Sequence, residues 1–227
     1  MNSTIGLPEL ETSIAQNGKD YMLQPGVGFT FKEKMSGGFS MSESDPQSGA
    51  DTGQKNGSRL TMHATVNIPD LNAFFTDEQH AGTLTGDLDF APLGSNLRST
   101  RGIFKLFSPA DRPDLKYMVY ELGFEASNGS YYFAGRKEVK RDAITNAWKA
   151  TTTLYSQLYD GPNKSGQIIG AGILTLAVAD LLAMIPTMQA TNAPNKEQAV
   201  EAFAKFGQFF LGELWNTYVG SAGPRKV

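Results

Sequence analysis

Between residues 27 and 175, nine short segments of alternating apolar and polar residues follow one another, and this rhythm constrains the fold most strongly. Such alternation is typical of strands with one buried face. Turn-forming residues separate most segments, as at 91–94, 108–114 and 160–166. Because antiparallel strands need only short connections, the pattern predicts an antiparallel meander. The predicted strands cover 27–33, 36–42, 59–68, 81–90, 98–107, 115–125, 130–140, 149–158 and 166–175.

A meander of this size predicts a mostly β fold, an up-and-down (lipocalin-like) β-barrel over residues 27–175. A two-sheet β-sandwich is the alternative, since both architectures show the same alternation. Residues 1–26 resemble an extended lead-in, and the polar, glycine-rich residues 43–58 a mobile loop. Residues 70–79 favour a short helix that closes one end, and 176–220 favour C-terminal helices packed on the barrel.

The dipeptide Asn128-Gly129 marks the clearest hairpin. Both residues tolerate the positive φ that a two-residue type I′ turn requires. If they form the turn, Glu121 lies directly opposite Arg136. One face then forms the main core, with Met118, Tyr120, Leu122, Phe124, Tyr131 and Phe133. The other face is mixed, with Tyr117, Val119, Glu121, Arg136 and Glu138, and is therefore covered, lines a cavity or meets a partner.

The last predicted helix begins at Asn195, an N-cap candidate with Gln198 three residues later, as in a capping box. Its apolar stripe is broad and aromatic, which favours packing across the outer wall of the barrel. The alternative is a surface that binds another protein. The residues of this stripe that would then bind a partner are Phe206, Phe210 and Trp215.

Composition excludes several classes of function. The net charge of −3 does not supply the positive surface that nucleic-acid binding needs. With no cysteine and only two histidines, the chain offers neither thiolate metal sites nor a histidine-rich one, and we expect no metal. The glycines of 166–172 lack the third glycine of a dinucleotide-binding fingerprint, so no cofactor is expected.

The amino terminus lacks the basic and apolar regions of a secretory signal, and a cytoplasmic location is expected. Residues 166–188 carry a single charge over a length that could cross a bilayer. Three glycines and Pro186 interrupt this stretch, so a buried strand followed by a buried helix explains it better, and no membrane span is expected.

Four residues are candidates for a ligand-binding site: Glu121, Arg136, Tyr117 and His63. Glu121 and Arg136 would form a cross-strand ion pair on the surface, or a polar anchor for a ligand head group if their face lines a cavity. His63 lies on a polar strand face and is most simply a hydrogen-bonded surface histidine. Asp87 and Asp89 are most simply a solvated face, although two carboxylates can bind calcium. No nucleophile elbow is present, and no catalytic residue is assigned.

Several segments carry a resemblance to a known family. They are 29–39 (FTFKEKMSGGF), 102–107 (GIFKLF), 117–124 (YMVYELGF), 132–137 (YFAGRK), 151–155 (TTTLY) and 170–174 (GAGIL). Over about residues 27–219 the chain resembles the non-catalytic region appended to cholesterol-oxidase-like GMC flavin oxidoreductases in large bacterial proteins that also carry an α/β-hydrolase. The resemblance implies an accessory role near sterol or lipid chemistry, with a flavin oxidoreductase or hydrolase as partner.

The sequence therefore predicts a non-catalytic module that binds a lipophilic small molecule, sterol-like or fatty-acid-like, or that assists a lipid-modifying oxidoreductase. An eight-stranded barrel has room for one small ligand. Two alternatives stay open. One is a small-barrel enzyme of the cyclase or isomerase type that uses Glu121, Arg136 and His63, and the other is an interaction module that docks through the last helix.

Overall fold

The structure, a computed structural model, describes residues 22–140 and 147–218. Its elements follow in chain order as β1 (Gly28–Ser40), α2 (Pro46–Lys55), β2 (Arg59–Ile68), α3 (Leu71–Thr76), β3 (Ala81–Phe90), β4 (Gly94–Pro109), β5 (Leu115–Ala126), β6 (Gly129–Lys140), α4 (Ala147–Thr152), β7 (Thr153–Asp160), β8 (Ile168–Thr175), α5 (Val178–Met184), the 3₁₀ turn η2 (Ile185–Thr187), β9 (Gln189–Thr191) and α6 (Lys196–Tyr218).

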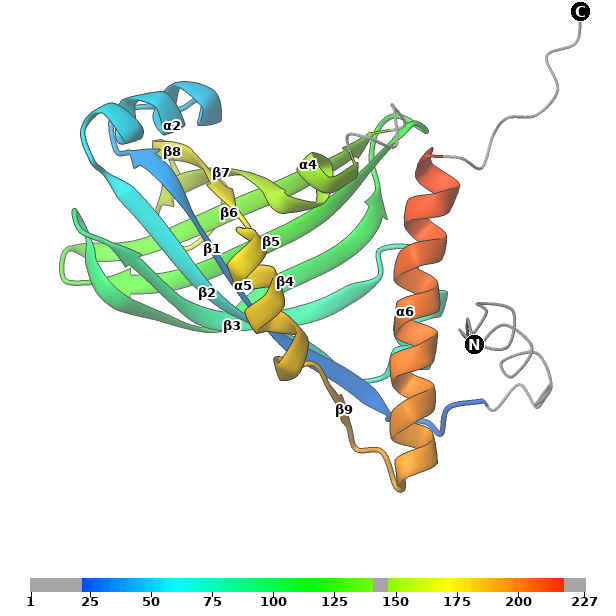
Figure 1. Cartoon of the computed structure of the whole chain (residues 1–227). Coiled ribbons are helices and arrows are strands. Elements are labelled where there is room, and N and C mark those ends of the chain that lie inside the picture. Colours follow the sequence, from blue (N-terminus) through cyan, green and yellow to red (C-terminus); the bar gives the residue numbers. More distant parts are fainter. Residues whose placement is uncertain (1–21, 141–146, 219–227) are drawn as a thin grey trace, which may run out of the picture.

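Strands β1 to β8 form a closed antiparallel barrel (Figure 1). Each strand pairs with the next along the chain, and β1 closes the sheet by pairing with both β2 and β8. The short β9 adds to the beginning of β1. This closure confirms the up-and-down barrel and decides against the sandwich, because each sheet of a sandwich has edge strands that pair on one side only.

Strand β1 runs unbroken where the sequence predicted two strands separated near residue 34. Its second half contains Gly37 and Gly38, where the chain packs too closely for side chains. A Cβ on Gly37 would lie 1.9 Å from the carbonyl oxygen of Ile173, and one on Gly38 would lie 2.4 Å from that of Ala50. The glycines therefore serve close packing within a continuous strand, not a turn.

Residues 46–55 form helix α2, so the prediction of a mobile loop over residues 43–58 was wrong. Asp45 caps this helix by accepting a hydrogen bond of 2.9 Å from the amide of Ser48, and Pro46 starts it. Residues 149–152 were likewise predicted as strand but belong to helix α4, which ends before β7 begins at Thr153.

The β5–β6 hairpin turns one residue earlier than predicted. Gly129 is the first residue of β6, with φ at 146°, and pairs with Ala126. The register therefore shifts by two residues, so that Glu121 lies opposite Ala134 and Arg136 lies opposite Val119. A shift of two leaves every side chain on its predicted face, which is why the core face was predicted correctly although the pairs were not.

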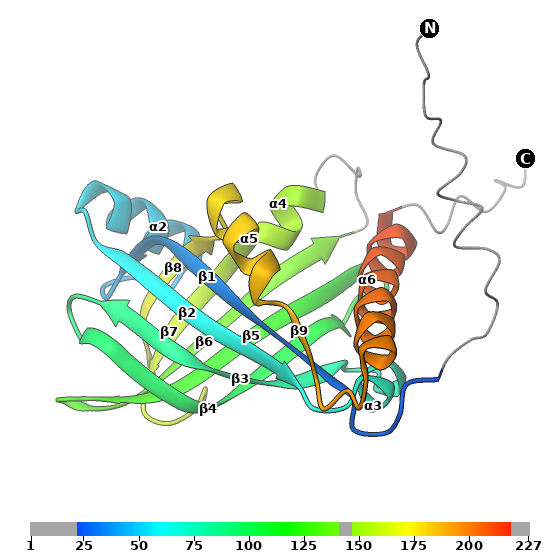
Figure 2. The same cartoon turned by 60° about the horizontal axis from the view of Figure 1, so that its bottom comes forward.

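Helix α6 crosses one end of the barrel, whereas α2 lies at the opposite end (Figures 1 and 2). Phe206 of α6 stacks on Phe29 of β1 with ring centroids 4.5 Å apart, and Phe209 contacts Phe74 of α3 at 5.5 Å. The prediction of a short helix at this end is confirmed by α3. The prediction that α6 packs on the outer wall of the barrel was wrong, since the aromatic stripe of α6 faces the barrel end.

The predicted start of α6 is confirmed, because the side chain of Asn195 accepts a hydrogen bond of 2.9 Å from the amide of Gln198. The side chain of Gln198 accepts a hydrogen bond of 2.8 Å from the amide of Gln24, a contact that ties α6 to the chain just before β1. Among the described residues, no helix is long and apolar enough to cross a membrane.

Candidate functional site

The inner face of β1 carries one charged side chain within an apolar row. Phe29, Phe31, Glu33 and Met35 alternate with outward-facing residues, and all four are buried. On β6 the same alternation places Lys137 inward, between Gly135 and Val139. The strand period therefore brings a carboxylate and an ammonium group into the barrel interior.

Glu33 and Lys137 meet inside the barrel together with Tyr120 of β5. The Nζ of Lys137 lies 2.7 Å from Oε1 of Glu33 and 3.2 Å from the hydroxyl oxygen of Tyr120. The Tyr120 hydroxyl donates to Oε2 of Glu33 at 2.8 Å. The exposed fractions are 4% for Glu33, and 2% for Tyr120 and Lys137. These three residues are called the inner triad below.

The electrostatics of the inner triad follow from its burial. Desolvation, and then the charge and hydrogen bond of Glu33, raise the pKa of Tyr120 well above its ordinary value of 10. Tyr120 therefore stays a neutral hydrogen-bond donor at physiological pH. The Lys137 ammonium also lies 4.8 Å from the centroid of the Tyr120 ring, within cation–π distance. The triad combines one negative and one positive charge and is neutral overall.

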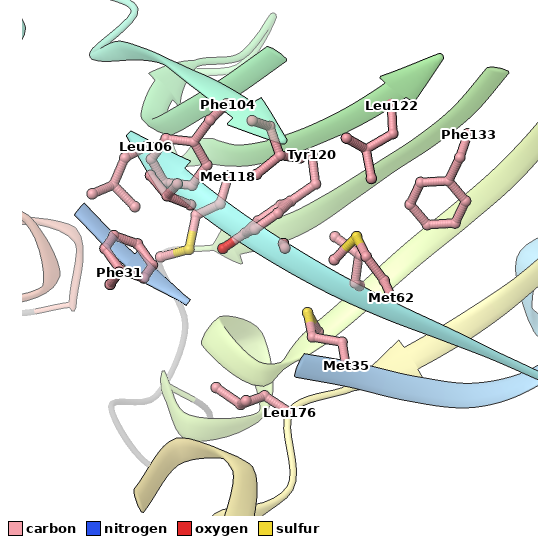
Figure 3. Close-up of a cluster of buried hydrophobic side chains, with 14 of the residues drawn as sticks. Phe31, Met35, Met62, Phe104, Leu106, Met118, Tyr120, Leu122, Phe133 and Leu176 are labelled. Carbon is pink, nitrogen blue, oxygen red and sulfur yellow. The ribbon is translucent and has the colours of Figure 1, made fainter. Parts of the chain in front are cut away.

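A cavity of about 520 Å³ lies between the inner triad and the helices at the barrel end. Figure 3 shows Phe31, Phe104, Leu106 and Met118 around the Tyr120 side chain, with Leu122 and Phe133 farther along the barrel. The residues that line the cavity are Phe29, Phe31, Glu33, Phe104, Leu106, Met118, Tyr120, Lys137, Ala147, Trp148, Thr151, Thr152, Leu176, Leu181, Met184, Ile185, Met188, Phe203, Phe206, Gly207, Phe210, Leu211 and Leu214. Among these lining residues, the triad, Thr151, Thr152 and Trp148 have an oxygen or nitrogen atom in the side chain. The other lining residues have none.

Exposed apolar side chains from three helical segments surround the outer side of this cavity. Trp148 of α4, Ile185 of η2 and Leu211 of α6 line it and are 49%, 53% and 66% exposed. Exposed apolar side chains that gather at one place, rather than lying singly, are typical of interaction or ligand sites. The cavity therefore opens between α4, η2 and α6, with the inner triad on its far wall.

The predicted ion pair between Glu121 and Arg136 does not form. Oε1 of Glu121 lies 2.5 Å from Nζ of Lys164, and Oε2 accepts a hydrogen bond of 2.5 Å from the hydroxyl of Tyr132. Arg136 pairs instead with Glu138 at 3.3 Å. The hairpin register explains the difference, because it moves Arg136 two positions away from Glu121.

The other two ligand-binding candidates also lie on the outer side of the barrel. Tyr117 contacts Arg136, whose guanidinium carbon is 5.1 Å from the Tyr117 ring centroid. His63 points outward between the inward-facing Met62 and Ala64. Thus Glu121, Arg136, Tyr117 and His63 do not line this cavity, and their role in ligand binding stays a prediction.

The sheet register brings His63 of β2 together with Asp87 and Asp89 of β3. His63 lies opposite Asp87, and its Nε2 is 3.5 Å from Oδ2 of Asp89. The possible ligand atoms of the three residues lie within 4.8 Å of one another, the one group of this kind within residues 22–140 and 147–218. All three side chains are partly exposed, and His63 and Asp89 are in contact on the barrel surface.

The predicted partner-binding residues of α6 contact their own chain. Phe206 is buried against Phe29, and Phe210 lies 5.4 Å from Phe107 by ring centroids. Both line the cavity. The side chain of Trp215 lies outside the described part of the chain.

Sequence reasoning missed Glu33 and Lys137, although a signal for both was present. Each occupies a position that the strand alternation assigns to the core, where a charged residue is rare unless it is paired. Two opposite charges at core positions of different strands would have suggested a buried pair. Comparison with protein family models, with characterised proteins and with solved structures gives no match.

Proposed function

We propose that this protein binds a lipophilic small molecule in the cavity at the α6 end of the barrel. The single observation that carries the proposal is the cavity itself, about 520 Å³ of mainly apolar space that ends at a buried polar triad. Small-molecule sites are typically concave and apolar, with a few fixed polar groups, and have volumes of roughly 300–1,000 Å³. The exposed apolar rim of Trp148, Ile185 and Leu211 supports the same proposal, because it offers a route to the interior.

The chain offers a matched pair of substitutions to test this. Gly207 lines the cavity, and a Cβ added there would meet no atom within 4 Å. Gly212 lies on the same helix, is equally free of neighbours and does not line the cavity. Leucine favours helix over glycine, so neither Gly207→Leu nor Gly212→Leu should harm folding. Gly207→Leu fills part of the cavity, whereas Gly212→Leu leaves it open.

The measurement is native mass spectrometry with lipid extraction on protein purified from its own host. An apolar molecule should co-purify with the wild type and with Gly212→Leu, and should be lost or reduced about tenfold in Gly207→Leu, since the leucine side chain takes up space that the ligand would occupy. A protein that carries no such molecule, and takes up none when lipids are offered, would contradict the proposal.

The resemblance described above supports a setting for this function beside a flavin oxidoreductase or a hydrolase. In that setting the module would hold a lipophilic substrate or product for its partner. Co-purification of such an enzyme with the tagged chain tests the partner proposal separately. If no such enzyme co-purifies, the partner proposal fails and the ligand-binding proposal still stands.

A further inference from the structure

The hydrogen bonds of the inner triad leave one donor unpaired. An ammonium group has three N–H bonds. Within the described residues, Lys137 donates to two acceptors, Oε1 of Glu33 and the hydroxyl oxygen of Tyr120. The Tyr120 hydrogen is used by Oε2 of Glu33. One N–H of Lys137 therefore lacks a described acceptor, and Lys137 lines the cavity.

Charge balance decides what can accept this hydrogen bond. The pair of Glu33 and Lys137 is already neutral, and both side chains are 3% exposed. A ligand carboxylate bound here would add an unpaired negative charge beside Glu33 in a water-poor space, which is strongly unfavourable. An uncharged carbonyl or hydroxyl oxygen accepts the same hydrogen bond without that cost. A hydroxyl group can in addition donate to a free lone pair of Glu33.

We propose that the ligand of this cavity is an uncharged lipophile with one carbonyl or hydroxyl oxygen, which binds with that oxygen against Lys137 and its hydrocarbon part toward α6. This inference rests on the proposed function and narrows it. It favours ketone-like or alcohol-like lipids, including sterol-like ones, and excludes free fatty acids as preferred ligands. The cavity lining supports an uncharged ligand, because among the described lining residues only Glu33 and Lys137 of the triad are charged.

The test compares four probes that share a twelve-carbon chain: dodecane, 1-dodecanol, 2-dodecanone and dodecanoate. Each displaces the neutral fluorescent probe N-phenyl-1-naphthylamine from the wild-type protein in slightly alkaline buffer, where dodecanoate is ionised. The affinity for the alcohol and the ketone should be at least about tenfold higher than that for dodecane and dodecanoate, as expected for a hydrogen bond to a charged donor.

A variant reverses the preference. Glu33→Gln removes the negative charge and leaves Lys137 as an unpaired cation, so dodecanoate should gain about tenfold or more and become the tightest of the four. The control is Glu138→Gln, which makes the same change in net charge on the outer face, where Glu138 pairs with Arg136 and Lys140. It should leave the ranking unchanged. If Glu33→Gln does not fold, the wild-type ranking decides alone.

The outcomes separate the two proposals. If the wild type binds dodecanoate most tightly, or binds dodecane as well as the alcohol, the ligand does not use Lys137 and this inference is overturned while lipid binding stands. If neither the fluorescent probe nor any of the four compounds binds, the proposed function fails and the inference with it.

Discussion

Lys137 and Glu33 dominate the chemistry at the residue scale because each neutralises the other in the barrel interior. Removing one partner leaves a buried charge uncompensated, which costs roughly 3–5 kcal/mol, whereas replacing both with neutral residues is often tolerated. We therefore predict that Lys137→Met is strongly destabilised and that Glu33→Gln combined with Lys137→Met recovers much of the loss. Urea unfolding of the wild type, both single variants and the double variant measures this cycle. Additive losses would show that the two side chains do not act as a pair.

Asp70 supports the barrel end through two backbone hydrogen bonds. It accepts from the amide of Ala73 at 2.9 Å, as the N-cap of α3, and from the amide of Gly26 at 2.7 Å. These bonds, that of Ala73 foremost, lower the pKa of Asp70 below its ordinary value of 3.8. Asp70→Ala removes both bonds and should cost about 1 kcal/mol near neutral pH.

The pH dependence of this effect has a definite sign. A lowered pKa in the folded state means that Asp70 stabilises the protein above pH 3.8 and that its contribution is lost as the pH falls through the folded-state pKa. The difference in unfolding free energy between wild type and Asp70→Asn should therefore shrink on acidification. A difference that stays constant or grows in acid would contradict the assigned role.

The two inward charges also show how far single residues could be predicted. Strand alternation alone places Glu33 and Lys137 in the core, so their burial was within reach of the sequence. Their contact was not, because it depends on how β1 and β6 face each other across the closed barrel. Glu121 and Arg136 failed for the opposite reason, since a turn displaced by one residue shifts the register by two and removes a pair that seemed local.

At the scale of elements, helix α2 depends on two glycines one turn apart. A Cβ on Gly49 would lie 2.0 Å from the carbonyl oxygen of Ala171, and one on Gly53 would lie 2.2 Å from the amide nitrogen of Phe39. Both clashes are with backbone, which cannot rotate away. We predict that Gly49→Ala and Gly53→Ala each destabilise the protein by about 1–3 kcal/mol, more than the roughly 1 kcal/mol that alanine gains over glycine in a helix.

Gly212→Ala is the control for this prediction, because its added Cβ meets nothing within 4 Å. It should leave the free energy of unfolding unchanged or raise it by up to about 1 kcal/mol. Thermal unfolding of the three variants measures the contrast. Equal behaviour of all three would mean that α2 does not pack on β1 and β8 as closely as described.

The same contact explains why α2 was missed in the sequence. Glycine and polar residues at 46–55 favour a loop by local propensity, and the helix is stabilised by its fit against the backbone of strands distant in sequence. The strands β2, β3, β5 and β6 were predicted to within about one residue, because their alternation is a local signal.

For the whole molecule, the central feature is a barrel that is filled at one end and hollow at the other. Met35, Met62, Leu122 and Phe133 are fully buried and fill the interior beyond the inner triad (Figure 3). The barrel itself could be predicted from the number of strands and the short connections between them. Which end is filled and which is hollow could not be predicted, because a filled and a hollow barrel share the same alternation of inward and outward residues.

The methionines allow the most direct test of this account. Met118, Met184 and Met188 line the cavity, whereas Met22 and Met41 lie outside it. With ¹³C-labelled methionine methyl groups, titration with 1-dodecanol should shift the signals of the three cavity methionines and leave those of Met22 and Met41 unchanged. Shifts confined to Met22 or Met41, or no shift at any methionine up to the solubility of the alcohol, would contradict a lipid-binding cavity between the inner triad and α6.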